Sequence, residues 1–217
     1  MARRSPSEKR QTISALQEAI DSDDWKIFQS TLKHAKKGDG DDVINWAVSR
    51  TYNPTYIRYV QALIPLTSNI VLGGDVVWSA AFVGDTPTLA LLTPYADEDI
   101  LQRAMYHAVQ QHNDGCVEHL MGLIDCTYEN NLPLRVAANN LTEIDNCSTI
   151  FNWLYERSDP HAALAYMKTR QELVTIAATK LMEQIVEQRT AEQLKNTINT
   201  AIGAGAGPLN NSGAKKL

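Results

Sequence analysis

The sequence predicts an all-α protein, a solenoid of stacked helical hairpins closed by a long C-terminal capping helix. Three observations support this fold class. Apolar residues recur at helical spacing, as at Ile13, Leu16 and Ile20. A unit made of an alanine-containing helix, a polar turn and an apolar helix recurs along the middle of the chain. Residues 161–200 contain no glycine or proline and many strong helix formers, which indicates one long helix or two joined helices.

Composition limits the class of protein. The chain has 217 residues, of which 44% are hydrophobic and 21% are charged, as is typical of soluble globular proteins. No apolar stretch approaches the roughly 18 to 20 residues of a membrane span, and no apolar region follows the basic N-terminus as in a secretory signal. We therefore expect a cytoplasmic protein, or one in a host's cytoplasm if the source is a virus. Three irregularly spaced cysteines predict buried thiols rather than a disulfide framework.

The charge is distributed unevenly along the chain. Residues 38–160 hold five Lys or Arg against sixteen Asp or Glu, a balance of −11, whereas residues 1–37 and 161–217 each carry +3. An acidic segment repels phosphate backbones, which argues against nucleic acid as its partner. A basic protein partner would suit this segment, and a solvated acidic surface is the simpler interpretation.

The N-terminal region predicts an arm and one helical hairpin. Residues 1–10 are polar and basic and are expected to form a flexible arm, with the first helix beginning near Thr12. Residues 11–40 then form the hairpin, whose second helix carries Trp25, Phe28 and Leu32 after the N-cap candidates of residues 21–24. Lysines followed by glycines at residues 36–40 indicate the end of this hairpin.

The recurring unit occupies residues 41–160. Its copies cover residues 45–64, 78–95, 106–124 and 134–156. The aligned alanines are separated by 33, 28 and 29 positions and are Ala47, Ala80, Ala108 and Ala137. Self-similarity at this period is typical of solenoids, in which each unit buries its apolar face by stacking on the next.

Two segments carry a resemblance to a known family. Residues 80–92 (AAFVGDTPTLALL) resemble the ankyrin repeat, in which paired small residues, a Gly-led turn and a second apolar helix follow one another. Residues 134–140 resemble the diverged ankyrin units of large viruses, where an Asn-rich loop, here Asn130 and Asn131, precedes a Leu-Arg-x-Ala helix. The resemblance covers residues 41–156 and implies an adaptor that binds proteins, including host proteins. The family's Thr-Pro-Leu-His start is absent, and a generic stack of helical hairpins is the alternative.

The C-terminal region differs from the repeats. Residues 161–202 predict a long helix or helix pair that caps the open end of the stack, because a solenoid needs a polar-faced cap. The alternative is that this helix pairs with a second copy of itself. Glycines at positions 203, 205 and 207 and Pro208 predict a flexible tail over residues 203–217.

No catalytic or metal motif is evident. His112, Cys116 and His119 would share one face of a single helix, at a spacing suited to metal ligands. The turn signal at residues 113–115 separates His112 from the other two and argues against a metal site. Gly73-Gly74-Asp75 lacks the Lys-Ser/Thr pair of a phosphate loop and indicates a turn between repeats. We therefore predict no catalytic residue, no metal, no cofactor and no enzymatic activity; an enzyme with its site in a groove of the fold is a third hypothesis.

The loops between repeats supply the candidate site. The loops near residues 73–75, 96–99 and 128–131 are expected to lie along one edge of the stack, with Tyr95 and Tyr128 as exposed aromatic anchors. Residues 97–99 are also expected to cap the helix that follows them. The predicted protein-binding residues are Asp75, Tyr95, Asp97, Glu98, Asp99, Tyr128, Glu129 and Asn130.

These observations predict a non-enzymatic protein–protein interaction module that is monomeric and binds neither nucleic acid nor membrane. The alternative function is a helical structural component of a larger, self-associating assembly. Oligomeric state separates the two, because only the second requires contacts between copies of the chain.

Overall fold

The computed structural model describes residues 5–50, 53–142, 148–170 and 175–205, and all of its regular elements are helical. No strand occurs in these ranges, so the predicted all-α class is confirmed for them. Within the same residues, no helix combines the length and apolarity needed to cross a membrane.

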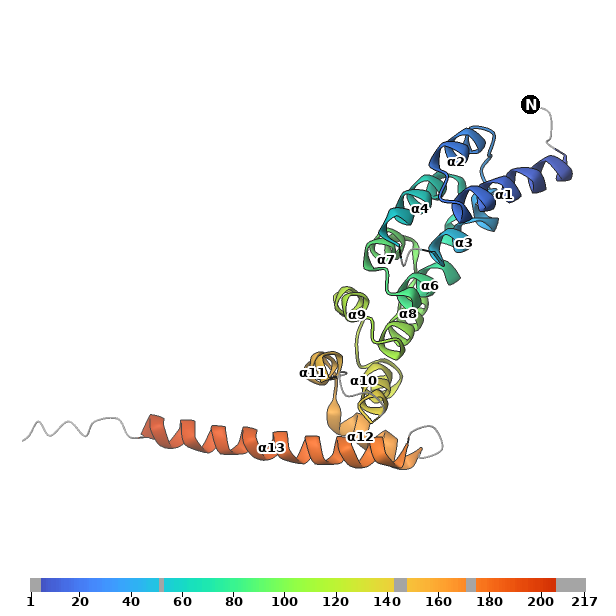
Figure 1. Ribbon diagram of the computed structural model, residues 1–217. Coiled ribbons are helices and arrows are strands. Elements are labelled where there is room, and N and C mark those ends of the chain that lie inside the picture. The colour runs from blue at the N-terminus through green and yellow to red at the C-terminus, as the bar shows by residue number, and fades with distance from the viewer. Residues whose placement is uncertain (1–4, 51–52, 143–147, 171–174, 206–217) are drawn as a thin grey trace, which may run out of the picture.

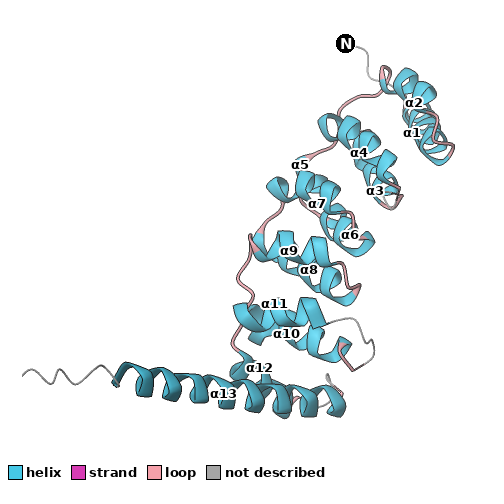
Figure 2. Ribbon diagram, turned by 60° about the vertical axis from the view of Figure 1, so that its left-hand side comes forward, coloured by secondary structure: helices cyan, strands magenta, loops and turns pink. Residues whose placement is uncertain are grey.

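Most helices form antiparallel pairs that follow one another along an elongated molecule (Figures 1 and 2). The first helix of each pair lies on one side of the row and the second helix on the other. The pairs are α1 (Pro6–Asp21) with α2 (Trp25–Leu32), α3 (Ile44–Val48) with α4 (Ile57–Leu63), α6 (Asp75–Val83) with α7 (Thr86–Leu92), α8 (Glu98–Gln110) with α9 (Asp114–Met121), and α10 (Tyr128–Asn140) with α11 (Ser148–Arg157). The short connecting elements are α5 (Asn69–Leu72) and the 3₁₀ turns Gly40–Asp42, Pro54–Tyr56, Ile64–Leu66 and Thr93–Tyr95.

Small residues let the first helices approach each other closely. The aligned alanines of α3, α6, α8 and α10 are at most 1% exposed. These helices contact one another in chain order, α3 on α6, α6 on α8 and α8 on α10. Because an alanine brings no bulk beyond its Cβ, the helix backbones can pack side by side while larger apolar residues fill the space between the two rows.

A carboxamide near the turn between the two helices of one unit closes the first helix of the preceding unit. Asn113, the N-cap of α9, donates from Nδ2 to the carbonyl oxygens of Ala81 (2.7 Å) and Phe82 (3.0 Å) at the end of α6, where Gly84 takes the left-handed conformation with φ of 83°. Asn140, the last residue of α10, donates from Nδ2 to the carbonyl of Val109 near the end of α8, at 2.9 Å. These three bonds go to carbonyls near helix ends, where intrahelical partners are lacking.

The C-terminal region is a pair of helices. Helix α12 (Pro160–Thr169) and helix α13 (Ile176–Gly205) both contact α10. The first half of α13 is packed, with Ala178, Met182 and Val186 at most 4% exposed. From residue 190 to residue 201 every side chain of α13 is exposed, and this half projects beyond the row (Figure 1).

The ends of the helices differ from prediction in two places. Helix α1 begins at Pro6 rather than near Thr12, so residues 6–10 are not a flexible arm. The reason is a capping box, in which Ser5 Oγ accepts from the Glu8 N–H (3.2 Å) and Glu8 accepts from the Ser5 N–H (2.7 Å). Helix α13 continues to Gly205, three residues past its predicted end, while the rest of the predicted tail lies outside the described residues, as does Cys147.

Candidate functional site

The three possible metal ligands of the sequence do not share a face. His112 lies in the turn between α8 and α9, with φ of 58°. Cys116 Sγ is buried 3.5 Å from Thr86 Oγ1, and His119 Nε2 lies 3.4 Å from Thr93 Oγ1. In the part of the chain that the structure describes, no group of three His, Cys, Asp or Glu side chains is placed to hold a metal ion.

An open pocket of about 520 Å³ lies between α8 and the start of α10. Helix α8 contributes side chains at positions 99, 102, 103, 106 and 107, whose spacing places them on one face of the helix. The opposite face, with Ala104, Met105 and Ala108, is buried against the neighbouring helices. The pocket is lined by Asp99, Gln102, Arg103, Tyr106, His107, Tyr128, Glu129 and Leu132.

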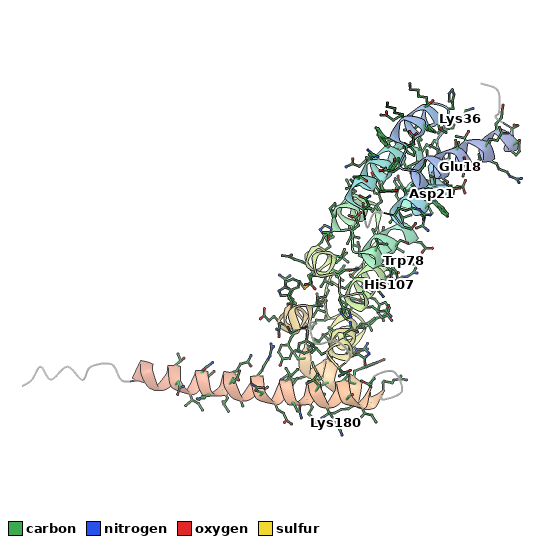
Figure 3. The ribbon with its side chains drawn as sticks, viewed as in Figure 1. Glu18, Asp21, Lys36, Trp78, His107 and Lys180 are labelled. Carbon is green, nitrogen blue, oxygen red and sulfur yellow. The ribbon has the colours of Figure 1, made fainter. Side chains whose placement is uncertain are left out.

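Aromatic rings continue from this pocket onto α6. The His107 ring lies 4.8 Å from the Trp78 ring and 6.1 Å from the Phe82 ring, centre to centre, and Tyr106 meets it edge-on at 5.3 Å. Figure 3 shows Trp78 and His107 together on the side of the molecule formed by the first helices. Phe82 is 45% exposed, so the aromatic area is accessible from outside.

The His107 imidazole is held in its neutral form. Burial lowers the pKa of His107, and the nearby positive charge of Arg103 lowers it further. Its Nδ1 is buried and has no hydrogen-bond partner in the described structure. The ring therefore contributes mainly apolar stacking surface near neutral pH.

Carboxylates outnumber cations around the pocket. Asp99 and Glu129 line it, and neither side chain makes a hydrogen bond or ion pair with any residue that the structure describes. Asp75 lies beside the pocket, where it accepts from Trp78 Nε1 (2.9 Å) and lies 3.8 Å from Arg103 Nη1. Arg103 is thus drawn toward Asp75, and the second nearby guanidinium, that of Arg135, is buried and near Glu129. Three carboxylates therefore face two guanidinium groups.

One wall of the pocket has an unusual backbone. Glu129, Asn130 and Asn131 are consecutive left-handed residues, with φ of 46°, 58° and 61°. The buried side chain of Arg135 holds this segment by donating from Nε to the Asn130 carbonyl (2.9 Å) and from Nη2 to the Glu129 carbonyl (2.7 Å). Such conformations are costly for residues other than glycine and persist where the surroundings fix them.

The structure brings four of the eight predicted binding residues together. Asp99, Tyr128 and Glu129 line the pocket, and Asp75 lies beside it through Arg103. Tyr128 is only partly exposed, and its hydroxyl donates to the Gln102 carbonyl at 2.7 Å. Burial raises the pKa of Tyr128. Because its hydroxyl is already hydrogen-bonded, this residue lines the pocket mainly with its ring.

The other four predicted residues lie outside the pocket. Asp97 is the N-cap of α8, as expected, and accepts from the Ile100 N–H at 3.0 Å. Glu98 accepts from a side-chain amide one turn further along α8. Tyr95 is 38% exposed, and the Asn130 carbonyl is occupied by an arginine side chain.

Sequence reasoning missed the helical side of the site. Arg103, Tyr106 and His107 lie in the middle of α8, while Trp78 and Phe82 lie on α6. For the three residues of α8, the signal in the sequence is the stripe of polar and aromatic residues at every third or fourth position of residues 99–107, opposite the apolar stripe.

Comparisons of the chain with protein-family models, curated proteins and solved structures give no match. The surface is therefore interpreted from its own geometry and chemistry.

Proposed function

We propose that the protein is a non-enzymatic interaction module, a solenoid of diverged ankyrin-like repeats that binds another protein in the cytoplasm or in a host's cytoplasm. The binding face is the α8–α10 surface, which we define by the residues Asp75, Trp78, Phe82, Asp99, Arg103, Tyr106, His107, Tyr128 and Glu129. The observation that carries this proposal is the coincidence of an open pocket, accessible aromatic rings and carboxylates that have no ion-pair partner. Aromatic residues are the side chains most enriched at binding hot spots.

The paired helices and their spacing support the repeat interpretation. Each first helix carries a buried alanine, and the equivalent bonds from Asn113 and Asn140 recur one unit apart. Rows of this kind present an extended surface along which successive units each add side chains.

A binding role suits the pocket better than catalysis. Its one imidazole, His107, has a lowered pKa and no acid or nucleophile hydrogen-bonded to it. Burial raises the pKa of both described cysteines, Cys116 and Cys126, which keeps them in the unreactive thiol form. Catalytic groups need positioned partners, and these side chains have none of that kind.

The test is quantitative capture of partners from source-cell lysate by the tagged full chain. The informative variant carries Asp99→Asn and Glu129→Gln, which remove two charges at almost constant size. Its matched control carries Glu118→Gln and Glu156→Gln, exposed acids on α9 and α11, on the other side of the row. A stoichiometric partner that the control retains and the pocket variant loses supports the proposal. If wild type captures no stoichiometric partner, the proposal fails.

The projecting half of α13 favours a second candidate, a self-associating structural component. Leu194 and Ile198 are 61% and 49% exposed, and with Ala191 and Ala201 they follow the alternating spacing of three and four of a helix-pairing seam. Sedimentation over a wide concentration range decides between the candidates. This alternative requires a larger species that disappears in the Leu194→Gln, Ile198→Gln variant, whereas the interaction module is monomeric at every concentration.

A further inference from the structure

The chain repeatedly places its own arginines on its own aromatic rings beside an oxygen acceptor. In the clearest case, Asp21 Oδ1 accepts from both Trp46 Nε1 (3.1 Å) and Arg50 Nε (2.9 Å). The Arg50 guanidinium carbon lies 3.8 Å from the centre of the Trp46 ring. Carboxylate, ring and guanidinium therefore form one closed cluster, in which each group satisfies another.

Two further clusters combine an arginine, an aromatic ring and a side-chain oxygen, which is a carboxylate in the first and a carboxamide in the second. The Arg58 guanidinium lies 5.0 Å from the Tyr59 ring centre and 2.6 Å from Asp23 Oδ1, which also accepts from the Tyr59 hydroxyl. The Arg189 guanidinium lies 4.2 Å from the Tyr155 ring centre and donates to the side-chain oxygen of Asn152.

The α8–α10 surface contains the same parts without the stacked arginine. Asp75 accepts from Trp78 Nε1, just as Asp21 accepts from Trp46. The face of the Trp78 ring is covered by His107 rather than by a guanidinium, and Arg103 makes no ring contact in the described structure. Tyr106 and Tyr128 line the pocket beside Asp99 and Glu129, and no guanidinium of the described residues stacks on either ring. Arg135 is near Tyr128 and Glu129, but it stacks on Tyr166 and donates to backbone carbonyls.

We infer that this pocket receives an arginine side chain from a basic segment of the partner, an inference that rests on the proposed function. The guanidinium stacks on the tyrosine rings and donates to the carboxylates of Asp99 and Glu129, which completes the cluster that the chain builds elsewhere from its own residues. Charge complementarity favours this occupant, because three carboxylates in and beside the pocket exceed the two nearby guanidinium groups. Asp75 draws Arg103 away, and the buried Arg135 is bound to backbone carbonyls.

The size of the pocket agrees with such an occupant. Its volume of about 520 Å³ is within the usual range of ligand sites and leaves room for part of the neighbouring backbone as well as one long side chain. A lysine would meet the carboxylates but would lack the planar group that stacks on a ring and pairs with two oxygens.

The experiment titrates the full chain with three tripeptides, acetyl-alanyl-X-alanine amide, in which X is arginine, lysine or citrulline. Citrulline keeps the shape of arginine and lacks its charge. Binding is followed through the backbone amide NMR signals of Arg103, His107 and Glu129. We expect saturable shifts with the arginine peptide, and binding weaker by about tenfold or more for citrulline and by a smaller factor for lysine.

Two variants locate the binding. The Asp99→Asn, Glu129→Gln pair should weaken binding of the arginine peptide by about tenfold, whereas the Glu118→Gln, Glu156→Gln control should bind as wild type does. Circular dichroism confirms that each variant is folded. Equal binding of arginine and citrulline peptides, or undiminished binding by the pocket variant, overturns the inference.

The failure of this inference is distinguishable from failure of the proposed function. If the pocket variant loses a captured partner and the arginine peptide causes no NMR shift, the arginine-binding inference is wrong and the proposed interaction module still stands. If the arginine peptide binds saturably and no partner is captured, the pocket binds arginine but the proposed interaction function is contradicted.

Discussion

Two regions of the molecule contain the same chemical groups in different states of completion. In the first two helix pairs, Arg50 lies over Trp46 and pairs with Asp21, so that the cluster is closed within the chain. On the α8–α10 surface, Asp75 and Trp78 are joined in the same way, but no arginine of the described residues covers the rings. The closed region satisfies its groups within the chain, and the open region leaves the contacts that the proposed function assigns to a partner.

Helix register explains the difference. Arg50 follows Trp46 by four positions, in the turn just past the end of α3, so its side chain reaches the ring. Arg103 belongs to α8, the first helix of the pair after the one that carries Trp78. His107, four positions after Arg103, occupies the place over the indole. Arg103 consequently meets Asp75 at 3.8 Å and no ring.

The largest expected effect concerns the wall of the open pocket. Arg135→Ala removes two hydrogen bonds from a buried guanidinium to the left-handed segment and leaves the carbonyls of Glu129 and Asn130 without that partner. We expect a loss of roughly 2–4 kcal/mol in the free energy of unfolding. Denaturant titration measures it, with Arg10→Ala on exposed α1 as the control, which should change stability by less than about 0.5 kcal/mol. Equal effects of the two substitutions would contradict the role assigned to Arg135.

A pair of tyrosines compares the two regions directly. Tyr59→Phe deletes a hydroxyl that donates to Asp23 at 2.8 Å in the closed region, and it should lower the free energy of unfolding by about 1–2 kcal/mol. Tyr106→Phe deletes a hydroxyl that makes no hydrogen bond with any described residue, and its effect should stay below about 0.5 kcal/mol. If denaturant titrations show that the Tyr106 substitution lowers the free energy of unfolding as much as the Tyr59 substitution does, the proposed difference between the two regions is wrong.

Local signals explain why the helices were easier to predict than the pocket. Asp24 and Asp97 cap α2 and α8 from positions next to the helix, and Gly84 ends α6. Each signal lies within a few residues of the feature that it sets. The capping box of Ser5 and Glu8 is also a local signal, but the basic composition around it led to the prediction of a flexible arm.

The pocket depends on contacts that no local pattern specifies. The Tyr128 hydroxyl reaches the carbonyl of Gln102, 26 positions earlier, and Arg103 meets Asp75 across two helices. The left-handed turn at Glu129 follows from Arg135, since asparagine neighbours permit this conformation without requiring it. The sequence therefore indicated the carboxylates of the loops and the ring of Tyr128, and it did not indicate the rings of Trp78, Tyr106 and His107.

Substitutions of two arginines, one in each region, should change stability by smaller amounts than the tyrosine substitutions. Arg50→Gln removes both an ion pair to Asp21 and a stacking contact with Trp46, and should cost about 1 kcal/mol. Arg103→Gln removes only a long, exposed ion pair and should change stability by less than about 0.5 kcal/mol. Thermal denaturation of the two variants at equal salt measures the difference, and a larger loss from the Arg103 substitution would mean that the second region is also closed.

The smallest effect is a pH dependence of stability near neutral pH that arises from His107 in the open region. The pKa of His107 lies below its ordinary value of 6.5 in the folded protein, because the ring is buried and Arg103 is near. Below about pH 6.5 the unfolded chain binds a proton at this position more readily than the folded chain does, so stability falls as the pH is lowered through this window.

The uncharged rings of Trp78, Phe82 and Tyr106 also contact this imidazole. His107→Phe keeps a ring against Trp78 and removes the titrating group. Its melting temperature should therefore fall less than that of wild type between about pH 7.5 and about pH 5.5, since the other histidines titrate in both proteins. An equal fall would mean that His107 takes up its proton as easily in the folded chain as in the unfolded one, and that its stacking on Trp78 does not depend on a neutral ring.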